Sequence, residues 1–142
     1  MKIVIDTNVF ISGIFFGGVP FDVLNTVISK KNEAYITPEI WDEYEDVIKR
    51  IATKYPSHMK QELVDSLFKL FKIIIPSSSI SLCRDPDDDK FITCAIDAKC
   101  EYIVSGDDDL LSVKSIDNIT ICTPAEFISS INGNTNPLDM KN

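Results

Sequence analysis

The sequence contains little of what several classes of site require. It has one histidine, His58, and no pair of its four cysteines has Cys-x-x-Cys spacing: Cys83, Cys94, Cys100 and Cys122. Structural zinc sites and thiol redox sites depend on such clusters, so neither is expected here. The cysteines are instead expected to be reduced and mostly buried. An enzyme with this composition would have to rely mainly on oxygen ligands and a metal.

The sequence also lacks a long apolar run and an excess of positive charge. No stretch approaches the ~20 apolar residues of a membrane span, and the first apolar run stops at Asp6, which is too early for a secretory signal. We therefore expect a cytoplasmic protein with no membrane association. The net charge is −8, which argues against a broad basic surface that binds nucleic acid unaided. Bound divalent cations or a basic partner protein would offset this charge.

The pattern that is present predicts an α/β domain. The 142 residues, 44% of them hydrophobic, suffice for one domain with a substantial core. Strands are predicted at 2–5, 34–36, 73–75, 102–105 and 119–122. Helices are predicted at 20–29, 38–53, 57–72, 87–99, 108–113 and 124–131. This alternation indicates a mainly parallel sheet covered on both faces, formed by residues 1–131, with 132–142 as a polar, flexible tail.

Two acidic residues follow predicted strands directly. Asp6 comes after the first strand, and Asp107 comes two residues after the strand at 102–105. In open α/β sheets, ligands bind outside the carboxyl ends of the strands. Both residues are therefore candidates for a site, although Asp6 could equally cap the segment that follows it.

Helical periodicity places further acids near the same region. In the helix at 38–53, Glu43 lies beside the apolar stripe and is suited to face a cleft, although alone it would also suit a surface ion pair. In the helix at 87–99, Asp88 falls inside the stripe, Asp89 at its margin and Asp87 on the far side. A carboxylate inside an apolar stripe is costly unless a partner such as a metal ion compensates it.

Other acids have simpler explanations. Asp85 can cap a helix before Pro86, and Asp87 and Asp108 can interact with helix dipoles in first turns. Even so, four separate segments each offer one inward carboxylate. Carboxylate oxygens suit Mg²⁺ or Mn²⁺, and two such ions about 4 Å apart can catalyse phosphodiester cleavage.

Four motifs, in this order and spacing, resemble those of the PIN-domain family. They are Asp-Thr-Asn-Val at 6–9, Pro-Glu-Ile-Trp-Asp-Glu at 38–43, Arg-Asp-Pro-Asp-Asp-Asp at 84–89 and Val-Ser-Gly-Asp-Asp-Asp-Leu-Leu at 104–111. The ending Thr-Pro-Ala-Glu-Phe at 123–127 is similar to the branch of toxin–antitoxin toxin components, the VapC-like ribonucleases. The resemblance implies a three-layer α/β/α fold with an acidic pocket at the carboxyl edge of a parallel sheet. It also implies cleavage of single-stranded RNA with Mg²⁺ or Mn²⁺.

The resemblance also assigns roles to individual residues. The catalytic quartet would be Asp6, Glu43, Asp88 and Asp107, of which Asp6, Asp88 and Asp107 would bind metal. Asp89 is an alternative to Asp88 because either register of the triple Asp matches the motif, and Asp109 is a further candidate ligand. Asn8 would support the turn at Asp6, and Ser105 would place a hydroxyl near the metal. A homodimer and a cognate antitoxin protein are the implied partners.

Two other functions compete with a nuclease. A non-catalytic PIN-like binding module would keep the pocket but act through a protein partner. An enzyme that forms an aspartyl-phosphate would use Asp6 as the nucleophile, but this sequence has Asn8 where such an enzyme needs a second Asp. The sequence therefore favours the ribonuclease, with the binding module as the alternative.

Overall fold

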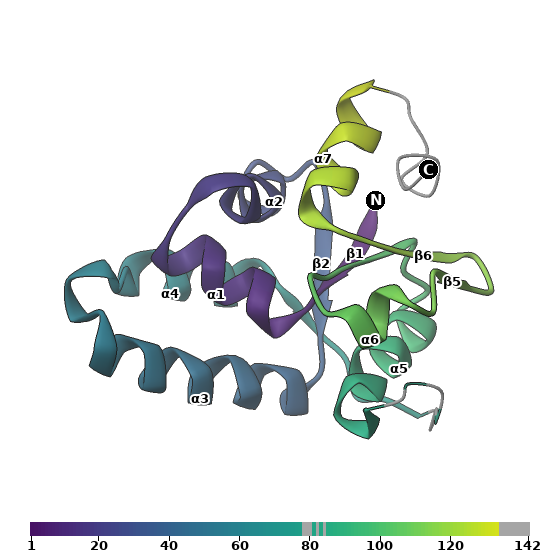
Figure 1. Cartoon of the computed structure of the whole chain (residues 1–142), viewed down its shortest axis with the longest axis horizontal. Helices are drawn as coiled ribbons and strands as arrows, with labels where there is room; N and C mark the ends of the chain where they lie inside the picture. Colours follow the sequence, from purple (N-terminus) through teal and green to yellow (C-terminus); the bar gives the residue numbers. More distant parts are fainter. Residues whose placement is uncertain (78–80, 82, 84, 134–142) are drawn as a thin grey trace.

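The computed structural model describes residues 1–77, 81, 83 and 85–133 (Figure 1). Arg84 and the predicted tail from 134 to 142 lie outside the described residues. The elements in chain order are β1 (Lys2–Ile5), α1 (Thr7–Phe15), α2 (Gly18–Ile28), β2 (Glu33–Ile36), α3 (Pro38–Lys54), η1 (Pro56–His58), α4 (Gln61–Leu70), β3 (Lys72–Ile73), η2 (Pro86–Asp88), α5 (Asp89–Asp97), β4 (Tyr102–Val104), α6 (Asp108–Leu111), β5 (Ser115–Ile116), β6 (Ile119–Cys122) and α7 (Pro124–Gly133).

The strands form a mixed sheet in the order β3-β2-β1-β4-β6-β5, in which only the β5–β6 pair of the described strands is antiparallel. Ile5 of β1 lies opposite Val104 of β4. The backbone N–H of Asp6 extends this ladder by donating to the carbonyl of Val104 at 3.0 Å. The segments after β1 and β4 therefore begin side by side, at the edge where ligands bind in parallel sheets.

Helices cover the sheet on both sides, which gives the expected three-layer α/β/α arrangement. Figure 1 shows α1 to α4 on one side of the sheet and α5 and α6 on the other. In the core, the rings of Phe10 and Tyr44 stack with centroids 4.1 Å apart. The hydroxyl of Tyr44, fully buried, donates to the carbonyl oxygen of Ile5. This contact ties α3 to the end of β1, one residue before Asp6.

Several sequence predictions were wrong in detail. Strand β5 was missed because two residues are too short to show a pattern, so strands and helices do not alternate throughout. The helix predicted at 57–72 is divided into η1 and α4. The strand predicted at 73–75 is observed at Lys72–Ile73. The N–H of Ile74 still donates to the carbonyl of Ile36 at 2.9 Å, but Ile75 is 77% exposed. Helix α7 continues to Gly133, past the predicted start of the tail.

The segment that follows β1 forms α1, where no helix was predicted from the sequence. No single helix among the described residues is long and apolar enough to cross a membrane. Helices α1 and α2 pass such a test only as a pair, and the chain bends by 97° between them.

Candidate metal centre and active site

Asp6 is a buried carboxylate fixed by the start of α1. Its side chain is 3% exposed and caps α1, since Oδ1 accepts from the backbone N–H of Val9 at 3.2 Å. The capping role considered from the sequence is therefore real, and it coexists with a place in the cavity described below. Burial raises the pKa of Asp6, while hydrogen bonds from Ser105 and from the backbone of Val9 and Asn8 oppose this effect.

Ser105 connects Asp6 with the next acidic segment. Its hydroxyl is buried, donates to Oδ2 of Asp6 and accepts from the backbone N–H of Asp107 at 2.9 Å. Asp107 caps α6, because its Oδ2 accepts from the N–H of Leu110 at 3.1 Å. One hydroxyl thus sets the spacing between two of the predicted ligands.

Glu43 reaches the cavity from α3. The position of Glu43 is set by its neighbour Tyr44. The contact of Tyr44 with β1 brings this turn of α3 against the start of α1. Oε2 of Glu43 accepts from the hydroxyl of Thr7, and Oε1 pairs with Nζ of Lys90 at 3.1 Å. Both carboxylate oxygens of Glu43 are therefore engaged by protein groups.

Asp88 differs from the other three acids of the cavity in the surroundings of one carboxylate oxygen. Its Oδ2 is buried and has no hydrogen-bond partner among the described residues. Burial, together with the neighbouring carboxylates of Asp107, Asp85 and Asp6, raises the pKa of Asp88 to about 7. When protonated, Asp88 can donate to Asp107; when ionised, it repels the negative charges around it.

Asp89 points elsewhere, contrary to its predicted place at the margin of the stripe. It is 8% exposed, more buried than Asp88, and its Oδ1 accepts from the N–H of Cys83 at 2.7 Å. The helical phase failed here because η2 is a 3₁₀ turn, which advances about 120° per residue, and α5 begins only at Asp89. Asp87 is exposed, as predicted.

The four predicted catalytic acids line one cavity of about 170 Å³: Asp6, Glu43, Asp88 and Asp107. Asn8 also lines the cavity. It is exposed, and its backbone N–H donates to the carboxylate of Asp6.

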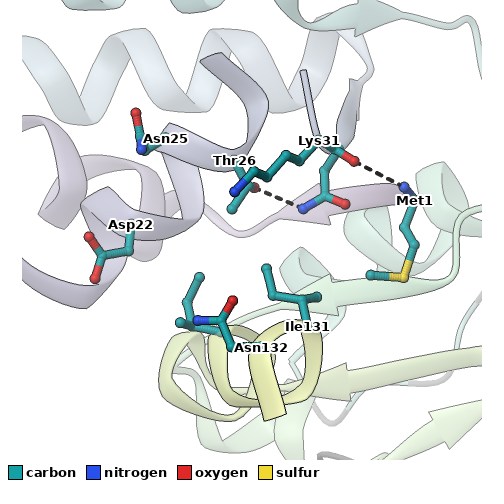
Figure 2. A pocket seen from close by; sticks show the side chains of 9 residues that line it. Met1, Asp22, Asn25, Thr26, Lys31, Ile131 and Asn132 are labelled. Atoms are coloured by element: carbon teal, nitrogen blue, oxygen red, sulfur yellow. Dashed lines mark hydrogen bonds between the residues drawn. The ribbon is translucent and has the colours of Figure 1, made fainter. Parts of the chain in front are cut away.

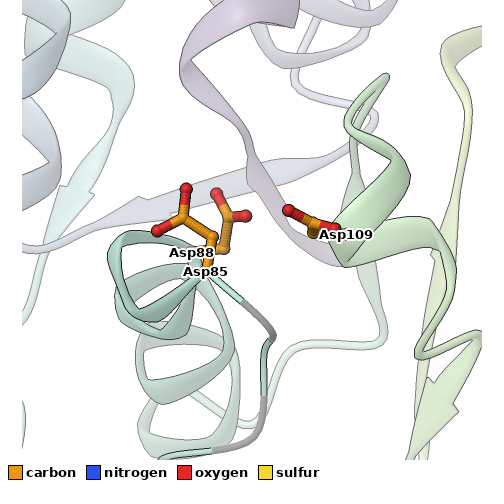
Figure 3. A group of neighbouring side chains, drawn as sticks. All are labelled: Asp85, Asp88 and Asp109. Carbon is orange, nitrogen blue, oxygen red and sulfur yellow. The ribbon is translucent and has the colours of Figure 1, made fainter.

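A second group of acids adjoins this cavity. Carboxylate oxygens of Asp85, Asp88 and Asp109 all lie within 4.8 Å of one another. Figure 3 shows Asp85 and Asp88 beside each other and Asp109 approaching from α6. Asp85 also caps η2 by accepting from the N–H of Asp87 at 3.0 Å, as the sequence suggested. Asp88 thus belongs to both groups.

The donor set fits a hard divalent cation. Mg²⁺ and Mn²⁺ take carboxylate oxygens, and an ion here would supply the buried oxygen of Asp88 with a partner. It would also offset the repulsion between Asp88 and Asp107. The sequence predicts Asp6, Asp88 and Asp107 as the residues that would hold it, and all three line the cavity. The carboxylate oxygens that lie within 4.8 Å of one another are those of Asp85, Asp88 and Asp109.

Three residues of the site were not assigned from the sequence. Thr7 and Lys90 contact Glu43, and Arg50 lines the cavity two helical turns after Glu43. Arg50 is predictable in retrospect, because positions 43, 47 and 50 share one face of α3. The contacts of Thr7 and Lys90 join residues far apart in the chain, so no local pattern indicates them.

A larger cavity of about 460 Å³ lies between α2 and α7 (Figure 2). Its lining contains one carboxylate among the described residues, that of Asp22. The buried Asn32 donates there to the hydroxyl of Thr26 at 2.9 Å. This cavity therefore lacks the clustered acids of the candidate metal centre.

The fold and the acidic cavity define a PIN-like α/β domain, and comparisons with known proteins identify the family. The chain matches the PIN domain family over residues 2–109. It is 34% identical to the uncharacterized protein MJ1680 of Methanocaldococcus jannaschii over 142 residues, covering 90% of each chain. This chain belongs to the PIN domain family.

A solved structure supports the fold. The chain is similar to one from the crystal structure of VapBC2 of Rickettsia felis bound to a DNA fragment from the promoter, with a TM-score of 0.59. The match covers 87% of this chain and 98% of the other, at 16% sequence identity. The three-layer fold expected from the sequence is therefore confirmed.

Proposed function

We propose that this protein is a metal-dependent endoribonuclease that cleaves phosphodiester bonds in single-stranded RNA with Mg²⁺ or Mn²⁺. The observation that carries the proposal is the ligand geometry around Asp88. A buried carboxylate oxygen of Asp88, which has no hydrogen-bond partner in the described part of the chain, lies in one cavity with Asp6 and Asp107. The acidic group of Asp85 and Asp109 lies beside it. Membership of the PIN domain family supports the same reading.

The fixed orientation of two carboxylates supports this proposal. Ser105 and the α1 N-terminus hold Asp6, and the α6 N-terminus holds Asp107. Fixed carboxylates bind an ion without a large ordering cost. When bound, a divalent cation supplies a polarised water and stabilises the charge that develops on the phosphate.

Arg50 gives the cavity a contact for RNA. It is the one cationic side chain among the described residues that line the cavity, it is exposed, and it has no ion pair within the described part of the chain. Arginine suits phosphate recognition because its guanidinium donates in a planar fork. We propose that Arg50 holds a phosphate next to the cleaved bond.

The test is cleavage of a mixed single-stranded RNA pool in Mn²⁺, Mg²⁺ or EDTA. Wild-type protein should cut only with metal, and Asp6→Asn should not cut. Asp87→Asn is the matched control, because Asp87 belongs to the same acidic run but is exposed, and it should cut like wild type. Absence of cleavage by the wild type would favour the binding-module alternative.

We further propose that the protein is the toxin of a toxin–antitoxin pair, acts in the cytoplasm, forms a homodimer and is held by a cognate antitoxin. The fold similarity to the R. felis VapBC2 chain motivates this proposal. Expression of wild type should arrest growth, Asp6→Asn should not, and co-expression of the adjacent gene should relieve the arrest. Growth arrest by Asp6→Asn equal to that by wild type would contradict a toxin role through cleavage.

A further inference from the structure

Lys90 is an enclosed cation next to the candidate metal centre. Its side chain is 10% exposed, and Nζ lies 3.1 Å from Oε1 of Glu43. Nζ also donates to the backbone carbonyl of Asp87 at 2.5 Å and lies 5.1 Å from the ring centroid of Phe91. These contacts fix the ammonium group in place.

The two sides of the cavity therefore differ. On one side, both oxygens of Glu43 have protein partners, Lys90 and Thr7. On the other side, Oδ2 of Asp88 has no partner among the described residues. A cation that bound Glu43 directly would compete with Lys90 for the carboxylate, and the two positive charges would repel each other in an enclosed site. A cation that bound Asp88 would break no ion pair within the described part of the chain.

We propose that Lys90 is a positioning residue that neutralises Glu43 and keeps it out of the direct ligand sphere of the metal. The divalent cation is then bound by Asp6, Asp88 and Asp107, and Glu43 contacts water or RNA beside it. This inference rests on the proposed nuclease function and deepens it by dividing the acids into ligands and a non-ligand.

Mn²⁺ affinity, measured by isothermal titration without RNA, tests the division. Lys90→Met keeps the length of the side chain but frees Glu43, so Mn²⁺ should bind about fivefold more tightly or more. The double variant Lys90→Met/Glu43→Gln replaces an ion pair by a neutral pair of similar volume. If Glu43 is not a ligand, its Kd should stay within about threefold of wild type.

Two controls separate this role from simple structural support. Lys90→Arg keeps the positive charge and should retain the wild-type Kd for Mn²⁺. In Lys90→Met, a loss of packing alone would not make Mn²⁺ bind more tightly. Asp88→Asn should weaken Mn²⁺ binding by about tenfold or more. Thermal melts in EDTA establish that each variant is folded before titration.

The outcomes distinguish the two proposals. Tighter binding by Lys90→Met together with wild-type affinity of the double variant supports the role of Lys90. A loss of about tenfold or more in the double variant, with wild-type binding normal, makes Glu43 a direct ligand and overturns the role of Lys90 alone. Absence of saturable Mn²⁺ binding by the wild type overturns the nuclease proposal, and this inference with it.

Discussion

Replacing Asp88 by Asn should stabilise the metal-free protein while it abolishes cleavage. In the absence of metal, the ionised Asp88 is a half-buried charge that lies near Asp107, and its Oδ2 has no hydrogen-bond partner among the residues that the structure describes. Asparagine removes the charge, keeps the volume and can donate to Asp107. Clustered carboxylates that bind a metal often lower the stability of the metal-free protein, because their charges repel one another.

The magnitude follows from the pKa of Asp88, which is raised from 3.8 to about 7. A difference of about three pH units corresponds to about 4 kcal/mol if it is fully expressed. Because Asp88 is partly exposed, solvent screening reduces this value, and we expect about 2 kcal/mol. For a domain of this size, that is a rise in Tm of roughly 6 °C.

The dependence on pH has a definite sign. Below pH 3.8 the carboxyl group of Asp88 is protonated in both the folded and the unfolded protein, so it costs nothing. Between pH 3.8 and about 7 the unfolded state ionises while the folded state holds its proton, and the wild type loses stability relative to Asp88→Asn. The full difference should therefore be present at pH 8 and nearly absent at pH 4.

Urea denaturation in EDTA at these two pH values measures the difference, with Asp87→Asn as the control because Asp87 is exposed. Adding Mn²⁺ should then narrow the difference. An ion at about 100 times its wild-type Kd stabilises the wild type by about 2.7 kcal/mol, whereas a variant that binds it about tenfold more weakly gains only about 1.4 kcal/mol. An Asp88→Asn variant that is less stable than wild type at pH 8, or equally changed at both pH values, would refute the reasoning.

Three further predictions concern other parts of the molecule. Ser105→Ala removes the hydroxyl between Asp6 and Asp107. It should lower the free energy of unfolding, measured by urea denaturation, by about 1–2 kcal/mol and should lower kcat more than it changes KM. An unchanged kcat would contradict this role. Arg50→Ala should weaken RNA binding and reduce the slope of log affinity against log salt by about 0.7, whereas an unchanged slope would remove Arg50 from the RNA contact. Gly13→Ala places a Cβ 2.6 Å from Cδ1 of Leu24 and 3.1 Å from the carbonyl of Pro20, so it should lower the free energy of unfolding by about 1–3 kcal/mol; wild-type stability would show that α1 and α2 can separate freely.

The fold was predictable where the sequence pattern is local. Buried parallel strands such as β1 read as continuous apolar runs, and the Thr37–Pro38 start of α3 shows both an N-cap and a proline in the first turn. Strand β5 was not predictable, because it exists only through its pairing with β6. The failure at Asp89 has a different origin: the 3₁₀ turn before α5 changes the helical phase.

The site was predictable in its main elements for a different reason. Strand ends converge in a parallel sheet, so acids that follow β1 and β4 are brought together by topology alone. The roles of Asp6, Glu43, Asp88 and Asp107 as catalytic residues remain predictions. The contacts of Glu43 with Thr7 and Lys90 depend on how α3 and α5 pack, and no property of a single segment encodes them.

The most direct test of the account locates the ion itself. Crystals of the wild-type protein soaked in Mn²⁺ should show an anomalous scattering peak within ligand distance, about 2.2 Å, of carboxylate oxygens of Asp6, Asp88 and Asp107. The same soak of inactive Asp88→Asn crystals should show a weaker peak or none. A peak that contacts only exposed acids away from this cavity, in protein that cleaves RNA with Mn²⁺, would contradict the account.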